Sequence, residues 1–316
     1  MKTYVVVGGA GFLGSHMCDL LIDRGDAVLC VDNLVTGAKA NIEHLQPHER
    51  FTFIENAVSL SLDIDEPIDA VMNLASPASP KDYFRFPIET LDVGSLGTRN
   101  CIDLALRNDA PMLMASTSEV YGDPTVHPQT EDYWGNVNPI GVRSVYDEAK
   151  RFSEALIMAF VREHGLRGRI ARIFNTYGPR MKPDDGRVVS NFVVQALRGD
   201  PITIYGDGSQ TRSFCFVQDE IAGLVALADS NVVGPVNIGN PGEFTISELA
   251  TMVVDMTGSR SRLVYEPLPS DDPTQRCPDI TMAKELLGWE PTVDLAEGLQ
   301  RTIAYFSSID AGATGN

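Results

Sequence analysis

The chain has 316 residues, 43% of them hydrophobic and 22% charged, a composition typical of a globular protein with one large domain or two closely joined ones. Its formal net charge of -18 argues against nucleic-acid binding, which needs a basic surface, and against docking on anionic membranes. No apolar run is long enough to cross a bilayer, and the first predicted strand begins at Thr3, which leaves no room for a signal peptide before it.

The sequence VVVGGAGFLGSH joins the first predicted strand to the first predicted helix. Gly8 allows a tight turn, Gly11 lets a phosphate approach the backbone, and Gly14 lets the helix pack closely on the strand. A dinucleotide pyrophosphate would then lie at the helix N-terminus. Asp32 ends the second predicted strand, where a carboxylate accepts hydrogen bonds from both ribose hydroxyls and repels a 2′-phosphate. The pattern therefore predicts binding of NAD rather than NADP.

Short apolar runs alternate with amphipathic stretches through the first half of the chain. Runs that are apolar throughout are typical of parallel strands covered on both faces, and helical patterns separate several of them. This is the βαβ arrangement of a doubly wound parallel α/β sheet of the Rossmann type. The predicted strands are 4–9, 27–33, 51–57, 70–76, 111–117 and 167–175, and the predicted helices are 12–24, 88–107 and 143–164.

Hydroxyl and carboxylate side chains follow the apolar run that ends at Thr117, in the sequence STSEVYGDP. Alone, this stretch would serve equally well as a helix cap or turn. In the helix that follows, SVYDEAKRF places Tyr146 and Lys150 four residues apart on one face. An ammonium nearby favours the phenolate of a tyrosine. Thr117, Tyr146 and Lys150 therefore form a predicted proton-handling triad beside the cofactor.

The pattern becomes less regular after Asn175, where proline and glycine cluster. We predict a helix over 187–198, strands over 202–205 and 262–266, a strand over 235–240 that returns to the main sheet, and a disordered tail after Ser308. We therefore expect an NAD-binding Rossmann domain, 1–174 and 213–240, and a smaller interleaved substrate lobe, 175–212 and 241–316. The cleft between them is the expected ligand site.

The five cysteines are odd in number, and no pair has metal-ligand spacing. Buried reduced thiols, and hence a cytoplasmic protein, are expected. The five histidines also lack ligand spacing, so we predict that they are structural or exposed and that no metal binds. These residues are Cys18, Cys30, Cys101, Cys215 and Cys277, and His16, His44, His48, His127 and His164.

Several longer motifs resemble those of the extended short-chain dehydrogenase/reductases, and within them those of the UDP-glucuronate decarboxylases, over essentially the whole chain. They are LASPASP (74–80), ASTSEVYGDP (115–124), HPQTEDYWGNVNPIG (127–141), ARIFNTYGPRM (171–181), DGRVVSNF (185–192) and RCPDI (276–280). Ser118 and Glu119 differ from the Asp-Glu pair of the related 4,6-dehydratases. The related 4-epimerases usually lack the acidic residue.

The resemblance implies NAD-dependent decarboxylation of UDP-glucuronate to UDP-xylose. Oxidation of C4 to a ketone makes the substrate a β-keto acid, whose CO2 leaves with the charge delocalised as an enolate. Tyr146 would take the proton of the C4 hydroxyl, and Thr117 would bond that hydroxyl or Tyr146. Glu119 and Arg276 would handle the substrate carboxylate and C5, with Ser118 as a polar neighbour.

The resemblance also implies which residues bind the two ligands. Arg212 is the best candidate for the pyrophosphate, because a guanidinium fork suits two oxygens. Cofactor contacts are expected from Gly8, Gly11, Phe12, Leu13, Gly14, Asp32, Asn33, Leu74, Ser76, Tyr146 and Lys150. Substrate contacts are expected from Ser118, Asn175, Arg180, Arg187, Asn191, Tyr205, Gln210, Arg212 and Arg276.

The helices over 88–107 and 143–164 pair into a four-helix bundle in members of this family. The resemblance therefore predicts a homodimer. The apolar residues expected at its interface are Leu104, Leu106, Leu156, Ile157 and Phe160.

Three positions depart from the family pattern near the expected cofactor. Ala57 stands where relatives commonly carry an aspartate facing adenine, and Gly94 stands where an asparagine is usual. Asp92 stands where a lysine can occur. These changes predict weaker retention of NAD and release of UDP-4-keto-xylose together with UDP-xylose.

Two other functions compete with this prediction. One is a 4-epimerase or 4,6-dehydratase acting on another nucleotide sugar, which would release no CO2. The other is a non-catalytic NAD-sensing protein on the same fold, but such proteins often lose the Tyr-Lys pair that this chain keeps.

Overall fold

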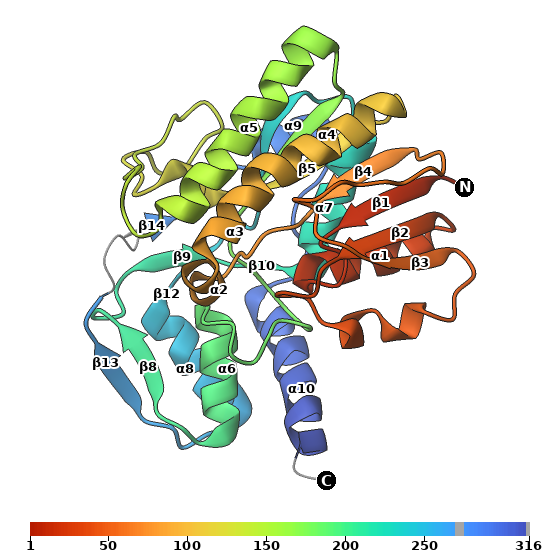
Figure 1. Cartoon of the computed structure of the whole chain (residues 1–316). Coiled ribbons are helices and arrows are strands. Elements are labelled where there is room, and N and C mark those ends of the chain that lie inside the picture. The colour runs from red at the N-terminus through yellow and green to blue at the C-terminus, as the bar shows by residue number, and fades with distance from the viewer. Residues whose placement is uncertain (269–274, 314–316) are drawn as a thin grey trace.

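The main sheet has seven parallel strands in the order β3-β2-β1-β4-β5-β6-β11, as the computed structural model of residues 1–268 and 275–313 describes (Figure 1). This order is that of a doubly wound Rossmann sheet, so the predicted fold class is confirmed. The edge strand β11 pairs with β6, as predicted for 235–240. The strands are β1 (Thr3–Val7), β2 (Ala27–Asp32), β3 (Phe51–Glu55), β4 (Ala70–Asn73), β5 (Met112–Thr117), β6 (Gly168–Ile173) and β11 (Gly234–Ile238).

Helices cover both faces of this sheet, which explains why its strands are apolar throughout. On one face, Val5 and Val7 pack with Ile102 of α4 (Thr98–Arg107) and Ile157 of α5 (Ser144–His164). On the other face, alternate side chains of β1 pack with helices α1 (Phe12–Asp23) and α7 (Val217–Asp229). Consecutive strand residues point to opposite faces, so each strand serves two cores.

A second group of elements lies below the main sheet in Figure 1. It contains a two-stranded sheet, β13-β8, and a three-stranded sheet, β12-β9-β14, with helices around them. Its strands are β8 (Ile202–Tyr205), β9 (Thr211–Ser213), β12 (Glu243–Thr245), β13 (Leu263–Glu266) and β14 (Gln275–Arg276), and its helices are α6 (Val188–Arg198), α8 (Ile246–Thr257) and α10 (Leu295–Ala313). The exact division of the chain into two domains stays a prediction.

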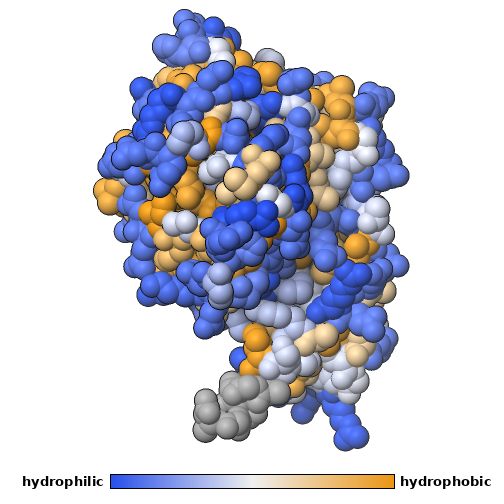
Figure 2. Space-filling model, turned by 90° about the vertical axis from the view of Figure 1, so that its right-hand side faces the viewer, coloured by the Kyte–Doolittle hydropathy of each residue, from blue (hydrophilic) through white to orange (hydrophobic). Residues whose placement is uncertain are grey.

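The face drawn in Figure 2 is mostly hydrophilic, with hydrophobic side chains in separate patches. This surface agrees with a chain in which 22% of the residues are charged. Within residues 1–268 and 275–313, no helix combines the length and the apolar character that crossing a membrane requires.

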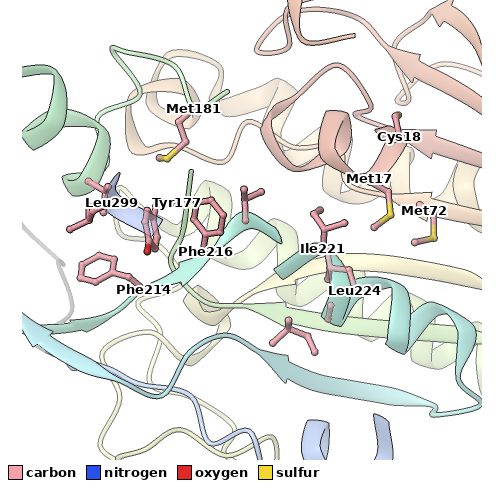
Figure 3. Close-up of a cluster of buried hydrophobic side chains, with 14 of the residues drawn as sticks. Met17, Cys18, Met72, Tyr177, Met181, Phe214, Phe216, Ile221, Leu224 and Leu299 are labelled. Atoms are coloured by element: carbon pink, nitrogen blue, oxygen red, sulfur yellow. The ribbon is translucent and has the colours of Figure 1, made fainter. Parts of the chain in front are cut away.

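One hydrophobic core joins the main sheet to the second group of elements (Figure 3). Met17 and Met72 belong to its sheet end, and Phe214 and Leu299 belong to its other end. Tyr177 lies between them. The centre of its ring is 5.6 Å from that of Phe216 and 6.4 Å from that of Phe214, and both contacts are edge-on. The short strands β7 (Thr176–Tyr177) and β10 (Cys215–Phe216) pair in parallel and align these rings.

The structure differs from the prediction in three places. The helix expected over 88–107 is divided into α3 (Pro87–Asp92), the π-helical turn η3 (Val93–Gly97) and α4. The disordered tail predicted after Ser308 is wrong for 309–313, because α10 continues to Ala313 from a segment anchored by buried Leu299 and Phe306. Residues 314–316 of that tail lie outside the described residues.

The third difference concerns the apolar residues expected at a dimer interface. Leu104 and Ile157 are fully buried in the chain's own core. Leu106, Leu156 and Phe160 are partly buried and pack against the same core. Leu104 and Ile157 therefore serve the fold of the single chain, whereas Leu106, Leu156 and Phe160 keep part of their surface exposed, so that their place at a dimer interface stays a prediction.

Candidate active site

A cavity of about 450 Å³ opens where β5 and β6 end, at the carboxyl edge of the main sheet. Ligands of open α/β sheets bind at this edge. The second group of elements closes the cavity from the opposite side. All five predicted catalytic residues line it: Thr117, Glu119, Tyr146, Lys150 and Arg276.

The glycine turn between β1 and α1 leaves no space for side chains. A Cβ on Gly8, whose φ is +79°, would lie 2.8 Å from the backbone of Ala75. A Cβ on Gly14 would lie 2.0 Å from the carbonyl oxygen of Gly8. This close approach of helix and strand is what the third glycine of a dinucleotide-binding turn provides.

Asp32 ends β2 beside this turn. Its Oδ2 accepts a hydrogen bond from the backbone N–H of Ala10 at 2.9 Å, and its Oδ1 accepts one from Leu34 at 2.8 Å. The carboxylate is thereby held next to the glycine turn, where the residues fit an NAD molecule with its ribose hydroxyls at Asp32. Of the other predicted cofactor contacts, Leu13, Leu74, Ser76, Tyr146 and Lys150 line the cavity, and Gly11, Phe12 and Asn33 lie in the turn or just after β2.

Tyr146 and Lys150 lie on the buried side of α5. The ring of Tyr146 stacks on that of Tyr83 with centroids 5.2 Å apart and planes 10° apart. Lys150 Nζ donates to the carbonyl of Ala115 at 2.8 Å and lies 5.9 Å from the centre of the Tyr146 ring. Burial raises the pKa of Tyr146 to about 12, against a hydrogen bond with Thr117 that lowers it. Burial lowers the pKa of Lys150 to about 8.

Thr117 is both a helix cap and a hydroxyl beside Tyr146, the two roles that its sequence context suggested. It is the last residue of β5, and its Oγ1 accepts a hydrogen bond from the backbone N–H of Glu119 at 3.2 Å. That bond caps the short helix η4 (Ser118–Tyr121). The cap fixes the hydroxyl at the cavity, where it lowers the pKa of Tyr146.

Two arginines hold Glu119 at the cavity wall. Arg143 Nη2 donates to Oε2 at 2.8 Å, and Arg276 Nη1 lies 3.4 Å from Oε1. Arg276 is 2% exposed and also donates to Ser118 Oγ and to the carbonyl of Gly122, each at 2.9 Å. Burial alone would raise the pKa of Glu119, but the guanidinium groups of Arg276 and Arg143 hold it well below its usual range. Glu119 is therefore ionised at neutral pH.

Most of the predicted substrate contacts line the part of the cavity nearer the second group of elements. Arg187 is bonded to Asp185 at 2.5 and 2.8 Å, and Arg212 Nη1 donates to the carbonyl of Thr211 at 2.9 Å. The lining residues of this set are Ser118, Asn175, Arg187, Asn191, Tyr205, Gln210, Arg212 and Arg276. Arg180 is absent from the lining and pairs with Asp19 at 2.7 Å, so the geometry does not support its predicted role.

Two residues of the site were missed by the sequence analysis. Arg143 lies three residues before Tyr146, one turn earlier at the start of α5, and this spacing is the one signal that could have found it. Tyr83, in the short helix α2 (Pro80–Arg85), has no local signal, because its stacking on Tyr146 joins segments far apart in the chain.

The five cysteines are free and buried, as predicted. His127, which is exposed as predicted, nevertheless lies in a cluster of metal-binding residue types that no sequence spacing indicated. His127, Glu243 and Cys277 each place a nitrogen, oxygen or sulfur ligand atom within 4.8 Å of the others. The three are far apart in the sequence, so no spacing rule could indicate them.

The chain belongs to the NAD dependent epimerase/dehydratase family, which it matches over residues 4–239. Its relatives include UDP-glucuronic acid decarboxylase 1 of Danio rerio, 53% identical over 306 residues that cover 97% of this chain and 73% of the relative. Similar solved structures include UDP-glucose 4-epimerase of Thermotoga maritima, with 30% identity, a TM-score of 0.88 and coverage of 97% and 99% of the two chains. UDP-glucuronic acid 4-epimerase of Bacillus cereus in complex with UDP-glucuronic acid and NAD has 28% identity, a TM-score of 0.86 and coverage of 98% and 100%. The predicted family is confirmed, and with it the dependence on NAD.

Proposed function

We propose that this protein decarboxylates UDP-glucuronate to UDP-xylose through a 4-keto intermediate, and that some UDP-4-keto-xylose is released. One observation carries the proposal. An ionised Glu119, held by Arg143 and Arg276, faces the same cavity as the Tyr146–Lys150 pair. The similarity to UDP-glucuronic acid decarboxylases over nearly the whole chain supports it.

Tyr146 handles the proton of the C4 hydroxyl. Its pKa of about 12 means that the phenol is protonated at neutral pH, so it needs positive charge to act as a base. Lys150 supplies part of that charge, and Thr117 lowers the pKa of the phenol. Bound NAD supplies the hydride acceptor and donor for C4.

The arginine pair handles the substrate carboxylate. Arg143 and Arg276 both form ion pairs with Glu119. The substrate carboxylate entering this cluster therefore meets two guanidinium groups and one negative charge. Loss of CO2 breaks the bond between C5 and C6 and moves that second negative charge away from Glu119, to the enolate oxygen at C4, until C5 takes up a proton. The cluster therefore binds the carboxylate and at the same time favours its departure.

Two further arginines would neutralise the negative charge of the substrate diphosphate. A protein with a net charge of -18 repels an anionic nucleotide sugar at long range, so binding depends on local cations. Arg187 and Arg212 line the cavity and carry planar forks suited to phosphate oxygens. Asn175, Asn191, Tyr205 and Gln210 are proposed to contact the sugar, phosphate and uridine.

Product analysis tests this function. Incubation with UDP-glucuronate and NAD+ should release CO2 and give UDP-xylose by mass spectrometry. Tyr146→Phe should lower turnover by about 10²–10⁴-fold without unfolding the protein, which is the usual contribution of a general base. The exposed Tyr265→Phe serves as the control. Formation of a C4 epimer without CO2 would instead support the 4-epimerase function of the similar solved structures.

We also propose a homodimer in the cytoplasm. Exposed apolar side chains gather on helices at one side of α5: Phe84, Ile88, Leu91, Leu96 and Phe152. Exposed apolar side chains on neighbouring helices favour a partner, and these helices suit a four-helix bundle with a second copy. Five free buried cysteines suit a reducing compartment.

A further inference from the structure

Three side chains of metal-binding type meet beside β14. His127 lies two residues before Gln129, which forms a β-bridge with Pro278. Glu243 begins β12, and Cys277 directly follows β14. One ligand atom from each lies within 4.8 Å of the other two, and His127 Nε2 is 3.0 Å from Glu243 Oε2.

This set matches the ligand chemistry of zinc. Imidazole nitrogen, carboxylate oxygen and thiolate sulfur are its three ligand types in proteins. Neighbouring ligand atoms in a tetrahedral zinc site lie about 3.3–3.8 Å apart. Side-chain rotations that move these three ligand atoms by about 1–1.5 Å would therefore allow all of them to bond one zinc ion.

The backbone around the cluster is already fixed. The strands that bring Glu243 and Cys277 together lie on either side of β9, in the order β12-β9-β14. Gln129 joins the third segment, because its N–H donates to the carbonyl of Cys277 and its Oε1 accepts from the N–H of Cys277, both at 2.9 Å. Thr211 Oγ1 donates to Glu243 Oε1 at 2.8 Å, which leaves Oε2 on the side of His127.

The burial of the three residues suits an ion that enters from solvent. Cys277 is 2% exposed and forms the inner wall, while His127 and Glu243 are exposed. A water molecule on the open side would complete four-coordinate geometry, as in zinc sites with three protein ligands.

We propose that His127, Glu243 and Cys277 bind one Zn2+ ion with water as the fourth ligand. The ion ties β14 to the segment at His127. Arg276 immediately precedes Cys277 and contacts Ser118 and Glu119. An ion bound to Cys277 would therefore restrict the movement of the Arg276 backbone. Metal binding does not depend on the proposed reaction.

Titration of the full-length protein with Co2+ and then Zn2+ tests the site. We expect one equivalent of Co2+ to give a sulfur-to-metal charge-transfer band, which Zn2+ then displaces, and Zn2+ to raise the melting temperature. Cys277→Ser should abolish the band. His127→Gln and Glu243→Gln should each weaken binding at least about tenfold, since each removes a ligand. His44→Gln, at an exposed histidine paired with Asp19, is the matched control and should bind normally.

Several outcomes would overturn the proposal. These are the absence of a charge-transfer band, a band that persists in Cys277→Ser, and equal affinity in wild type, His127→Gln and Glu243→Gln. Because His127 and Glu243 are exposed, their variants keep the test valid if Cys277→Ser does not fold.

Discussion

Glu119 is an ionised carboxylate in the wall of a cavity that we propose receives a second one. Removal of its charge, without a change of shape, separates its effect on CO2 release from its effect on C4 oxidation. Glu119→Gln should still allow oxidation at C4, seen as NADH absorbance, while CO2 release falls at least about tenfold, because the like charge that favours departure is gone. Rapid-mixing absorbance and CO2 measurements check this.

The control for this variant is Glu148→Gln, on α5 beside Tyr146 but paired with Arg151 near the surface. It should leave both signals unchanged. Equal loss of NADH formation and CO2 release in Glu119→Gln would show that the residue only maintains the site.

Glu220 is a second buried carboxyl, in α7 behind the cavity wall. Burial raises its pKa from 4.5 to about 8, against a hydrogen bond from Thr176 at 3.1 Å. Between these pH values the folded state holds a proton that the unfolded state has lost, so stability falls as pH rises from about 4.5 to 8.

Glu220→Gln imitates the protonated form and should remove this dependence. We expect it to gain about 1–3 kcal/mol relative to wild type between pH 5 and pH 8. Calorimetric melting at both pH values measures the gain, with the exposed Glu285→Gln as control. A constant difference between Glu220→Gln and wild type would mean that Glu220 is ionised when buried.

The residues that could be predicted are those with a motif in a short stretch of chain. Tyr146 and Lys150 share a helical face, and Thr117 and Glu119 follow one strand. The residues that could not be predicted meet through tertiary contacts alone. Tyr83 is stacked on Tyr146 from another helix, and Arg180, which its motif placed at the substrate, is drawn to Asp19 instead.

At the scale of elements, the π-helical turn η3 brings Gly94 against α5. A Cβ at this position would lie 2.7 Å from Ala149 Cβ, and Ser153 Oγ donates to the Gly94 carbonyl at 2.6 Å. The glycine therefore permits close packing next to Lys150. The family pattern alone indicates only the loss of a polar cofactor contact at Gly94.

We predict opposite results at two of the three departures from the family pattern, Gly94 and Ala57. Gly94→Asn should lose about 1–3 kcal/mol of stability through overpacking and should not tighten NAD binding. Ala57→Asp should keep stability and raise NAD affinity by up to about tenfold, the value of one hydrogen bond. Chemical denaturation and calorimetric titration with NAD+ measure both. Tighter NAD binding in Gly94→Asn would refute the packing explanation.

The long apolar runs predicted the main sheet well, because a strand buried on both faces has an unmistakable composition. Strands of two or three residues, such as β7, β10 and β14, are too short to show a period. These strands form because segments distant in the sequence pair with them: β7 pairs with β10, and β14 pairs with β9. The interruption at η3 was hidden for a similar reason, since only the packing of Gly94 on Ala149 shows it.

At the scale of the whole molecule, the exposed apolar side chains beside α5 predict a dimer. Phe152→Glu places a charge on that surface and should convert the dimer to a monomer, since an unpaired charge is costly in an apolar interface. Light scattering at micromolar concentration measures the mass. Leu286→Glu, an equally exposed position on α9 (Thr281–Leu287), should leave the dimer intact. A monomeric wild type would reject the dimer.

The core that joins Met17 to Leu299 limits how such an enzyme can acquire a new substrate. Tyr177, Phe214 and Phe216 interlock across the boundary at which a recombination event would have to cut. The second group of elements can be exchanged for that of a relative only if the incoming rings pack with the host's half of this core. Point changes along the cavity wall leave the core intact and therefore cost less stability than such an exchange.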